Sequence, residues 1–210
     1  MSKKTTLPAI APYLFFLLAC LACLKSYSQQ EKTTMVSNVT RLTFLNPGIS
    51  QEITIGKRQT LFGQLFVNTS ASAITYNNGQ DININFYFDP ALSVQLRHYY
   101  NGERRSGRGK RTEMNSMNYF AAIAETFISK YPANSDYIQE KRRPVTTLGA
   151  AWGLQRNYKG RFSLDLYLGA GYRFARSTIY TIPQPTTVNP TELILVSQIN
   201  IGGWLNKRKD

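Results

Sequence analysis

The feature that most constrains the fold is a strict alternation of apolar with polar or small residues from Arg161 to Phe174. One face of this segment is apolar throughout: Phe162, Leu164, Leu166, Leu168, Ala170, Tyr172 and Phe174. The other face holds Arg161, Ser163, Asp165, Tyr167, Gly169, Gly171 and Arg173. A period of two is typical of a β-strand whose two faces meet different surroundings. The segment therefore predicts a strand.

Seven further segments repeat this alternation less cleanly. They lie at 39–46, 51–56, 61–68, 91–99, 119–128 and 147–155, and around Ile199 and Ile201. Most are near the ~9–11 residues that a tilted strand needs to cross a bilayer. Together the eight segments predict an all-β fold, a closed antiparallel up-and-down transmembrane β-barrel of about eight strands.

The links between the segments fall into two sets. One set, predicted to lie outside the cell, covers 46–50, 70–90, 130–144 and 175–191; the other, predicted to be periplasmic, covers 57–59, 101–116 and 157–160. Short inner turns and longer outer loops are typical of outer-membrane barrels. The basic 101–116 link is long for a periplasmic turn.

The faces opposite the apolar ones carry charges of both signs, which bears on where the barrel lies. A soluble lipocalin-like barrel turns its apolar face inward. An eight-stranded barrel is just wide enough for side chains to fill its interior, and unpaired charges there would carry a heavy desolvation cost. We therefore expect a paired polar network inside, made of Arg41, Glu52, Gln95, Arg97, Glu125, Gln155, Asp165 and Arg173.

Aromatic and glycine positions add two expectations. Aromatic residues near segment ends are expected to form interfacial girdles. They are Phe44, Tyr100, Tyr119, Phe120, Tyr172, Phe174 and Trp204. Four glycines share the inward faces and are expected to leave room for bulky neighbours: Gly149, Gly153, Gly169 and Gly171.

The N-terminus has the pattern of a secretory signal peptide. Two lysines precede an apolar stretch at 9–24, and small residues follow it. This pattern predicts cleavage after Ser28, so that residues 1–28 are a leader and 29–210 the barrel domain. Acylation of Cys20 in a lipoprotein box is the alternative. Because Cys20 and Cys23 both lie in this leader, the mature chain offers neither a disulfide nor a thiolate metal site.

Lysine and arginine outnumber the acids by 25 to 12, a net charge of +13. Such a surplus often indicates nucleic acid or anionic lipid as a partner, and export argues against nucleic acid. One cluster lies in the 101–116 link: Arg104, Arg105, Arg108, Lys110 and Arg111. We expect these residues either to contact an anion or a lipid headgroup, or to form a solvated flexible loop.

Several different short motifs lie along the mature chain. They are 99–101, 104–105, 109–110, 115–116, 118–120, 153–156 and 168–172, the last reading Leu-Gly-Ala-Gly-Tyr. These motifs resemble those of the small outer-membrane β-barrel proteins of the Bacteroidetes. The resemblance implies an outer-membrane location and an architecture similar to the membrane domain of outer membrane protein A. It implies no activity.

His98 is the only histidine, which excludes a metal site built from several imidazoles. The stretch from Arg97 to Asn101 is similar to the His-x-Ser-Asn stretch of the outer-membrane lipid A deacylases, in which histidine activates the serine nucleophile. Tyr100 stands where that serine belongs, so only His98 and Asn101 match. We expect an interfacial histidine at a strand end, with neither enzymatic activity nor a cofactor.

The sequence thus favours a monomeric outer-membrane barrel with a polar, filled lumen and a structural or surface-interaction role. Its expected partners are outer-membrane lipids and an unidentified protein, and no nucleic acid. Three alternatives remain open: a narrow porin-like channel, a lipid-modifying outer-membrane enzyme, and a soluble lipocalin-like carrier.

Overall fold

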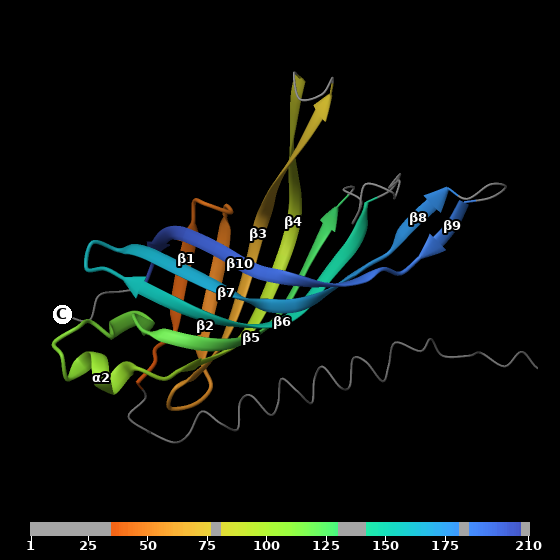
Figure 1. Ribbon diagram of the computed structural model, residues 1–210. Helices are drawn as coiled ribbons and strands as arrows, with labels where there is room; N and C mark the ends of the chain where they lie inside the picture. Colours follow the sequence, from red (N-terminus) through yellow and green to blue (C-terminus); the bar gives the residue numbers. More distant parts are fainter. Residues whose placement is uncertain (1–34, 77–80, 130–141, 181–184, 207–210) are drawn as a thin grey trace, which may run out of the picture. The chain divides into compact units, whose positions relative to one another are not determined.

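The computed structural model describes residues 35–76, 81–129, 142–180 and 185–206, so the expected leader lies outside the described residues. Eight antiparallel strands close into a barrel in the order β1-β10-β7-β6-β5-β4-β3-β2 (Figure 1). Their bounds are β1 Val39–Thr43, β2 Gly48–Thr54, β3 Gln59–Tyr76, β4 Asp81–Tyr99, β5 Asn118–Ser129, β6 Arg143–Asn157, β7 Phe162–Ala175 and β10 Thr191–Trp204. The predicted all-β, closed, eight-stranded barrel is confirmed.

The ring is closed between the first and the last strand of the chain. Only three residue pairs join β1 to β10, between 41–43 and 202–204. Thirteen pairs join β10 to its other neighbour, β7. The closing seam is therefore the shortest of the eight barrel ladders.

Side chains alternate between the lumen and the outside, and the polar ones point inward. In β4, Ser93, Gln95 and Arg97 are fully buried. Leu92, Val94 and Leu96, between and beside them, are 41% to 51% exposed. The barrel therefore carries its apolar surface outside and its polar surface inside.

The first turn differs from the prediction. Thr43 pairs with Gly48, so the link covers 44–47 and not 46–50, and β2 begins three residues earlier than expected. Asn46 has a φ of +54°, a conformation that asparagine tolerates better than most residues. Asn46 and Pro47 are the last two of the four turn residues.

The predicted loop at 70–90 is wrong, because β3 and β4 run through most of it. The two strands stay paired from Gln59↔His98 to Tyr76↔Asp81 and project beyond the ring (Figure 1). The alternation of isoleucine and asparagine at 82–85 was the missed signal. Pro90 is tolerated because β4 pairs with β5 only from Ala91 onward, and proline is accepted at strand edges.

The predicted 175–191 loop also contains strands. β8 (Ser177–Tyr180) and β9 (Pro185–Val188) pair with each other as a separate two-stranded sheet. They follow β7 and precede β10, at the same end of the ring as the β3–β4 projection (Figure 1). This end is called the open end below.

The opposite end of the ring is covered by residues 101–117, called the end cap below. The cap contains helix α2 (Gly102–Ser106) and the 3-10 turn η3 (Glu113–Asn115). The Asn115 side chain donates to the Ser37 carbonyl at 2.8 Å and accepts from the Ser37 amide at 2.7 Å. This basic link is longer than a turn needs to be because its residues cover the end of the ring.

Among the described residues, no helix is both long and apolar enough to cross a lipid bilayer.

Candidate functional site

The lumen divides into two halves, of which the half beside the end cap is filled. This closed half is defined by Arg41, Glu52, Gln95, Arg97, Tyr99, Tyr119, Gln155 and Asp165, and each of these is no more than 3% exposed. They come from β1, β2, β4, β5, β6 and β7. The alternating faces of six strands therefore converge on one polar network.

Arg97 lies at the centre of this network. Its Nη2 atom is 2.8 Å from Asp165 Oδ2, on a strand across the lumen. Its Nη1 donates to Gln155 Oε1 at 2.9 Å, and its Nε donates to Gln95 Oε1 at 2.9 Å. The guanidinium carbon also lies 3.7 Å from the centre of the Phe62 ring. A single cation thus connects groups on three strands across the lumen.

Glu52 forms the second charged centre. Arg41 Nη2 lies 2.5 Å from Glu52 Oε2. The Thr60 and Tyr99 hydroxyls both donate to Glu52 Oε1 at 2.6 Å. Gln155 Nε2 donates to Glu52 Oε2 at 3.5 Å as well. A buried carboxylate with one cation and three further donors meets the condition under which a buried charge is tolerated.

Gln155 joins the network to the end cap. Its Nε2 donates to the Met114 carbonyl in η3 at 3.1 Å. Asn157, two residues further along β6, donates to the same carbonyl. The cap is therefore bonded to the wall from within the barrel.

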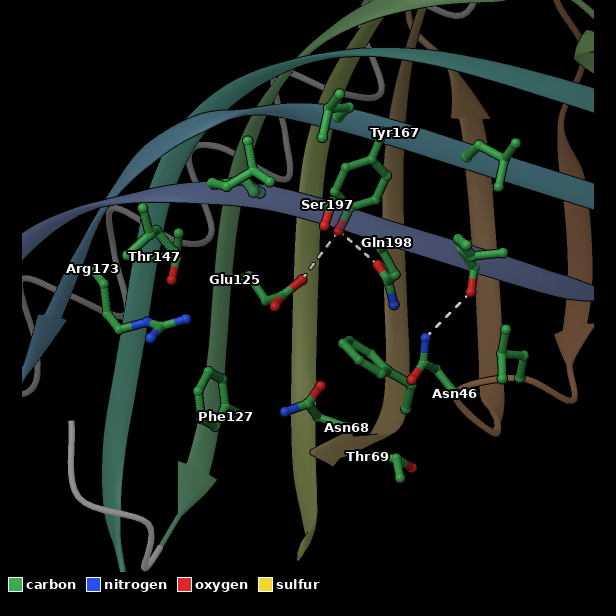
Figure 2. A pocket seen from close by; sticks show the side chains of 18 of the residues that line it. Asn46, Asn68, Thr69, Glu125, Phe127, Thr147, Tyr167, Arg173, Ser197 and Gln198 are labelled. Atoms are coloured by element: carbon green, nitrogen blue, oxygen red, sulfur yellow. Dashed lines mark hydrogen bonds between the residues drawn. The ribbon is translucent and has the colours of Figure 1, made fainter. Parts of the chain in front are cut away.

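The open half holds a cavity of about 740 Å³. Figure 2 shows Glu125, Tyr167, Gln198 and Arg173 pointing into it. The Tyr167 hydroxyl donates to Gln198 Oε1 at 2.6 Å and lies 3.4 Å from Glu125 Oε2. This half contains polar groups, but they line a space and do not fill it.

The eight predicted interior residues therefore fall into two groups. Six of them, Arg41, Glu52, Gln95, Arg97, Gln155 and Asp165, lie together in the closed half. Glu125 and Arg173 lie apart in the open half, where Arg173 is 3.9 Å from Glu192. Sequence reasoning missed Tyr99, Tyr119 and Thr60, whose hydroxyls complete the network.

The prediction for the inward glycines is right at Gly153 and wrong at Gly169. A methyl group on Gly153 would lie 2.3 Å from the Tyr119 ring, so the glycine does leave room for a bulky neighbour. A methyl group on Gly169 would lie 2.0 Å from the Ala150 carbonyl oxygen on the adjacent strand. There, close approach of two backbones requires the glycine.

Five of the seven predicted girdle residues are exposed on the outer surface: Phe44, Tyr100, Phe120, Tyr172 and Phe174. Tyr119 and Trp204 are corrections, since both are buried in the lumen. The Tyr119 hydroxyl donates to Asp165 at 2.7 Å, and the Trp204 indole donates to the Tyr158 carbonyl at 3.0 Å. A buried aromatic ring with a hydrogen-bond partner is a common arrangement.

His98 is exposed on β4, near the end-cap end of the ring. Its Nδ1 lies 3.1 Å from Gln59 Nε2. Asn101 Oδ1 instead accepts from the Asn118 amide at 2.8 Å. The two residues that match the deacylase stretch are thus held by different partners.

The basic cluster of the end cap is partly assembled into a pocket. Arg104, Arg105, Arg108 and Lys110 line a space of about 240 Å³ together with Arg156 of β6. Arg111 does not line it and pairs with Glu113 at 2.8 Å. The prediction omitted Arg156, which is distant in sequence.

Within the part of the chain that the structure describes, no group of three or more histidine, cysteine, aspartate or glutamate side chains is arranged to hold a metal ion.

No protein family, curated protein or solved structure matches this chain.

Proposed function

We propose that the chain is an outer-membrane β-barrel protein with a filled lumen and a structural or surface-interaction role. The observation that carries this proposal is the orientation of the two faces. Large apolar side chains on the outside are 40% or more exposed on all eight strands: Leu42, Ile49, Leu65, Leu92, Phe120, Leu148, Leu168 and Leu195 are examples, one from each.

Such an outer surface suits hydrocarbon better than water. Monomeric soluble proteins rarely expose a continuous apolar patch of more than a few hundred Å². A barrel also satisfies every backbone hydrogen bond within itself, as a bilayer demands. A soluble lipocalin-like carrier would need the opposite arrangement of faces.

The filled closed half argues for a structural role over a channel. A conducting pore needs a continuous water path, whereas Arg97 of β4 reaches into the lumen to Asp165 of β7 and Gln155 of β6. The interaction part of the role belongs to the open end. There the β3–β4 projection carries Phe86 and Phe88, both more than 60% exposed.

An enzymatic role receives no geometric support at the residue pair that suggested it. His98 faces outward, and Asn101 bonds to the backbone of the adjoining strand. Lipid A analysed by mass spectrometry after overexpression is expected to be unchanged.

The test of membrane residence is electrophoretic. The processed protein is expected to run at different positions on a detergent gel with and without boiling, and to remain with outer membranes after carbonate washing. Release into the carbonate supernatant would overturn the proposal. The same preparation in planar bilayers is expected to give no conductance above background. Steady single-channel current steps would contradict the filled lumen and favour the channel alternative.

A further inference from the structure

We propose that the pocket between the end cap and β6 binds a phosphate group, carried by the headgroup of a membrane lipid. The pocket is lined by Tyr100, Asn101, Arg104, Arg105, Arg108, Lys110, Asn118 and Arg156. Five of these eight side chains are cationic and none is acidic. The proposal rests on membrane residence only for the source of the phosphate.

The acids nearest in sequence are already paired elsewhere. Glu103 pairs with Arg58 of the β2–β3 turn, and Glu113 pairs with Arg111. These are the only two acidic residues between 101 and 117. The pocket cations are therefore left without a carboxylate partner among the described residues, and their mutual repulsion favours a bound anion.

Arg156 is fixed in place before any anion arrives. Its Nη1 donates to the Met117 and Gln155 carbonyls at 3.1 and 2.7 Å, and its Nη2 donates to Asn118 Oδ1 at 2.7 Å. Arg105 is also held, since its Nη2 donates to the Arg111 carbonyl at 3.1 Å. Its buried Nε has no partner within the described structure. A pre-organised cation loses little side-chain entropy when it binds a ligand.

The other three pocket cations, Arg104, Arg108 and Lys110, are exposed. Guanidinium groups can bind phosphate oxygens through two parallel hydrogen bonds. Two anchored arginines with three exposed cations beside them are suited to bind a phosphate group.

The position of the pocket indicates a lipid as the source of the phosphate. Tyr100 lines the pocket and also belongs to an outward aromatic cluster. Its ring stacks on Phe120 with centres 5.2 Å apart, and its hydroxyl accepts from the Trp152 indole at 2.8 Å. Exposed aromatic clusters of this kind lie at the headgroup level of membrane proteins. The cations therefore lie beside the level at which lipid phosphates occur.

The test uses the processed barrel folded in a phosphate-free amine-oxide detergent. Calorimetric titration compares three probes: dihexanoylphosphatidylglycerol, inorganic phosphate, and dihexanoylglycerol, which has the tails without the phosphate. We expect the phospholipid to bind most tightly, inorganic phosphate more weakly, and dihexanoylglycerol not at all. Equal affinity for inorganic phosphate and the phospholipid would overturn the lipid source, and binding of dihexanoylglycerol as tight as that of the phospholipid would overturn the phosphate site.

Two variants assign the binding to this pocket. In Arg104→Gln/Arg108→Gln, phospholipid binding is expected to weaken roughly tenfold or more, because charge-assisted bonds to phosphate are lost; Arg156→Gln is expected to weaken it as well. The matched control Lys57→Gln/Lys159→Gln removes two exposed cations from turns outside the pocket and is expected to bind as the parent does. Absence of binding by the parent, or equal weakening in the control, would overturn the proposal. Gel mobility with and without boiling checks that each variant is folded. That assay tests the membrane barrel, whereas the titration tests the anion site, so failure of one proposal can be told from failure of the other.

Discussion

The two halves of the lumen are built from the same eight strands, yet their ion pairs differ in burial and in distance. In the closed half, Arg97 and Asp165 are almost fully buried and 2.8 Å apart. In the open half, Arg173 and Glu192 are 34% and 44% exposed and 3.9 Å apart. The luminal ion pair beside the end cap is thus buried and close, whereas the pair at the open end is exposed and loose.

The largest expected effect is at the centre of the closed half. Arg97→Met leaves Asp165 buried without its cation, so we expect a loss of about 3–5 kcal/mol in the free energy of unfolding. Urea titration of the detergent-folded barrel, followed by gel mobility, measures the loss. The double variant Arg97→Met/Asp165→Leu is expected to recover most of it, since an apolar pair can replace a buried ion pair. A single-variant loss below about 1 kcal/mol would remove the contrast between the halves.

The second expected difference between the halves is how readily a reagent in water reaches a luminal side chain. Both cysteines of the sequence precede residue 29, so a chain beginning at residue 29 can carry one introduced thiol. Gln198→Cys in the open half is expected to react readily with a small water-soluble thiol reagent. Gln95→Cys in the closed half is expected to react roughly 100-fold more slowly, because it reacts only when the structure opens. Similar rates for the two thiols would show that water enters the closed half freely.

Crowding is the third contrast. Gly153→Ala places a methyl group 2.3 Å from the Tyr119 ring in the closed half, and overpacking of this kind costs about 1–3 kcal/mol. The control is Gly63→Ala, where a methyl group has no neighbour within 4 Å. The same urea titration should find the control close to the parent; an equal loss in both variants would point to backbone effects in place of packing.

The smallest effect is expected in the open half. Arg173→Met makes the same chemical change as Arg97→Met, but at a half-exposed residue with a distant partner. Its cost should be below about 1 kcal/mol, as for exposed ion pairs in general. A loss as large as that of Arg97→Met would mean that the open half depends on its charges as strongly as the closed half.

Much of this architecture could be predicted because the lumen and the exterior impose a two-residue period on the chain. The segment at 161–174 alone indicates which residues share a face, and Asp165 and Tyr167 do lie together on the face toward the lumen. Local alternation likewise placed Arg97 and Gln155 on inward faces. The face on which a residue lies can be predicted because it depends only on the residues next to it in sequence.

What could not be predicted depends on contacts between distant residues. Nothing near Asn115 in sequence indicates that it bonds to Ser37, and so the end cap looked like an overlong turn. Arg156 is 46 positions or more from the cap cations with which it lines a pocket. Tyr119 and Trp204 are in phase with inward residues of their strands, and the expectation that aromatic residues near segment ends form girdles assigned them wrongly to the outside.

The three-pair seam between β1 and β10 has a consequence for the order of assembly. β10, which completes the ring, comes after the other seven barrel strands in the chain, so the barrel cannot close until β10 has been made. Until then both unpaired edges must be kept from hydrocarbon and from other chains, since exposed edges invite pairing. Because that seam has the fewest paired residues of the eight barrel ladders, we expect it to form last and to part first.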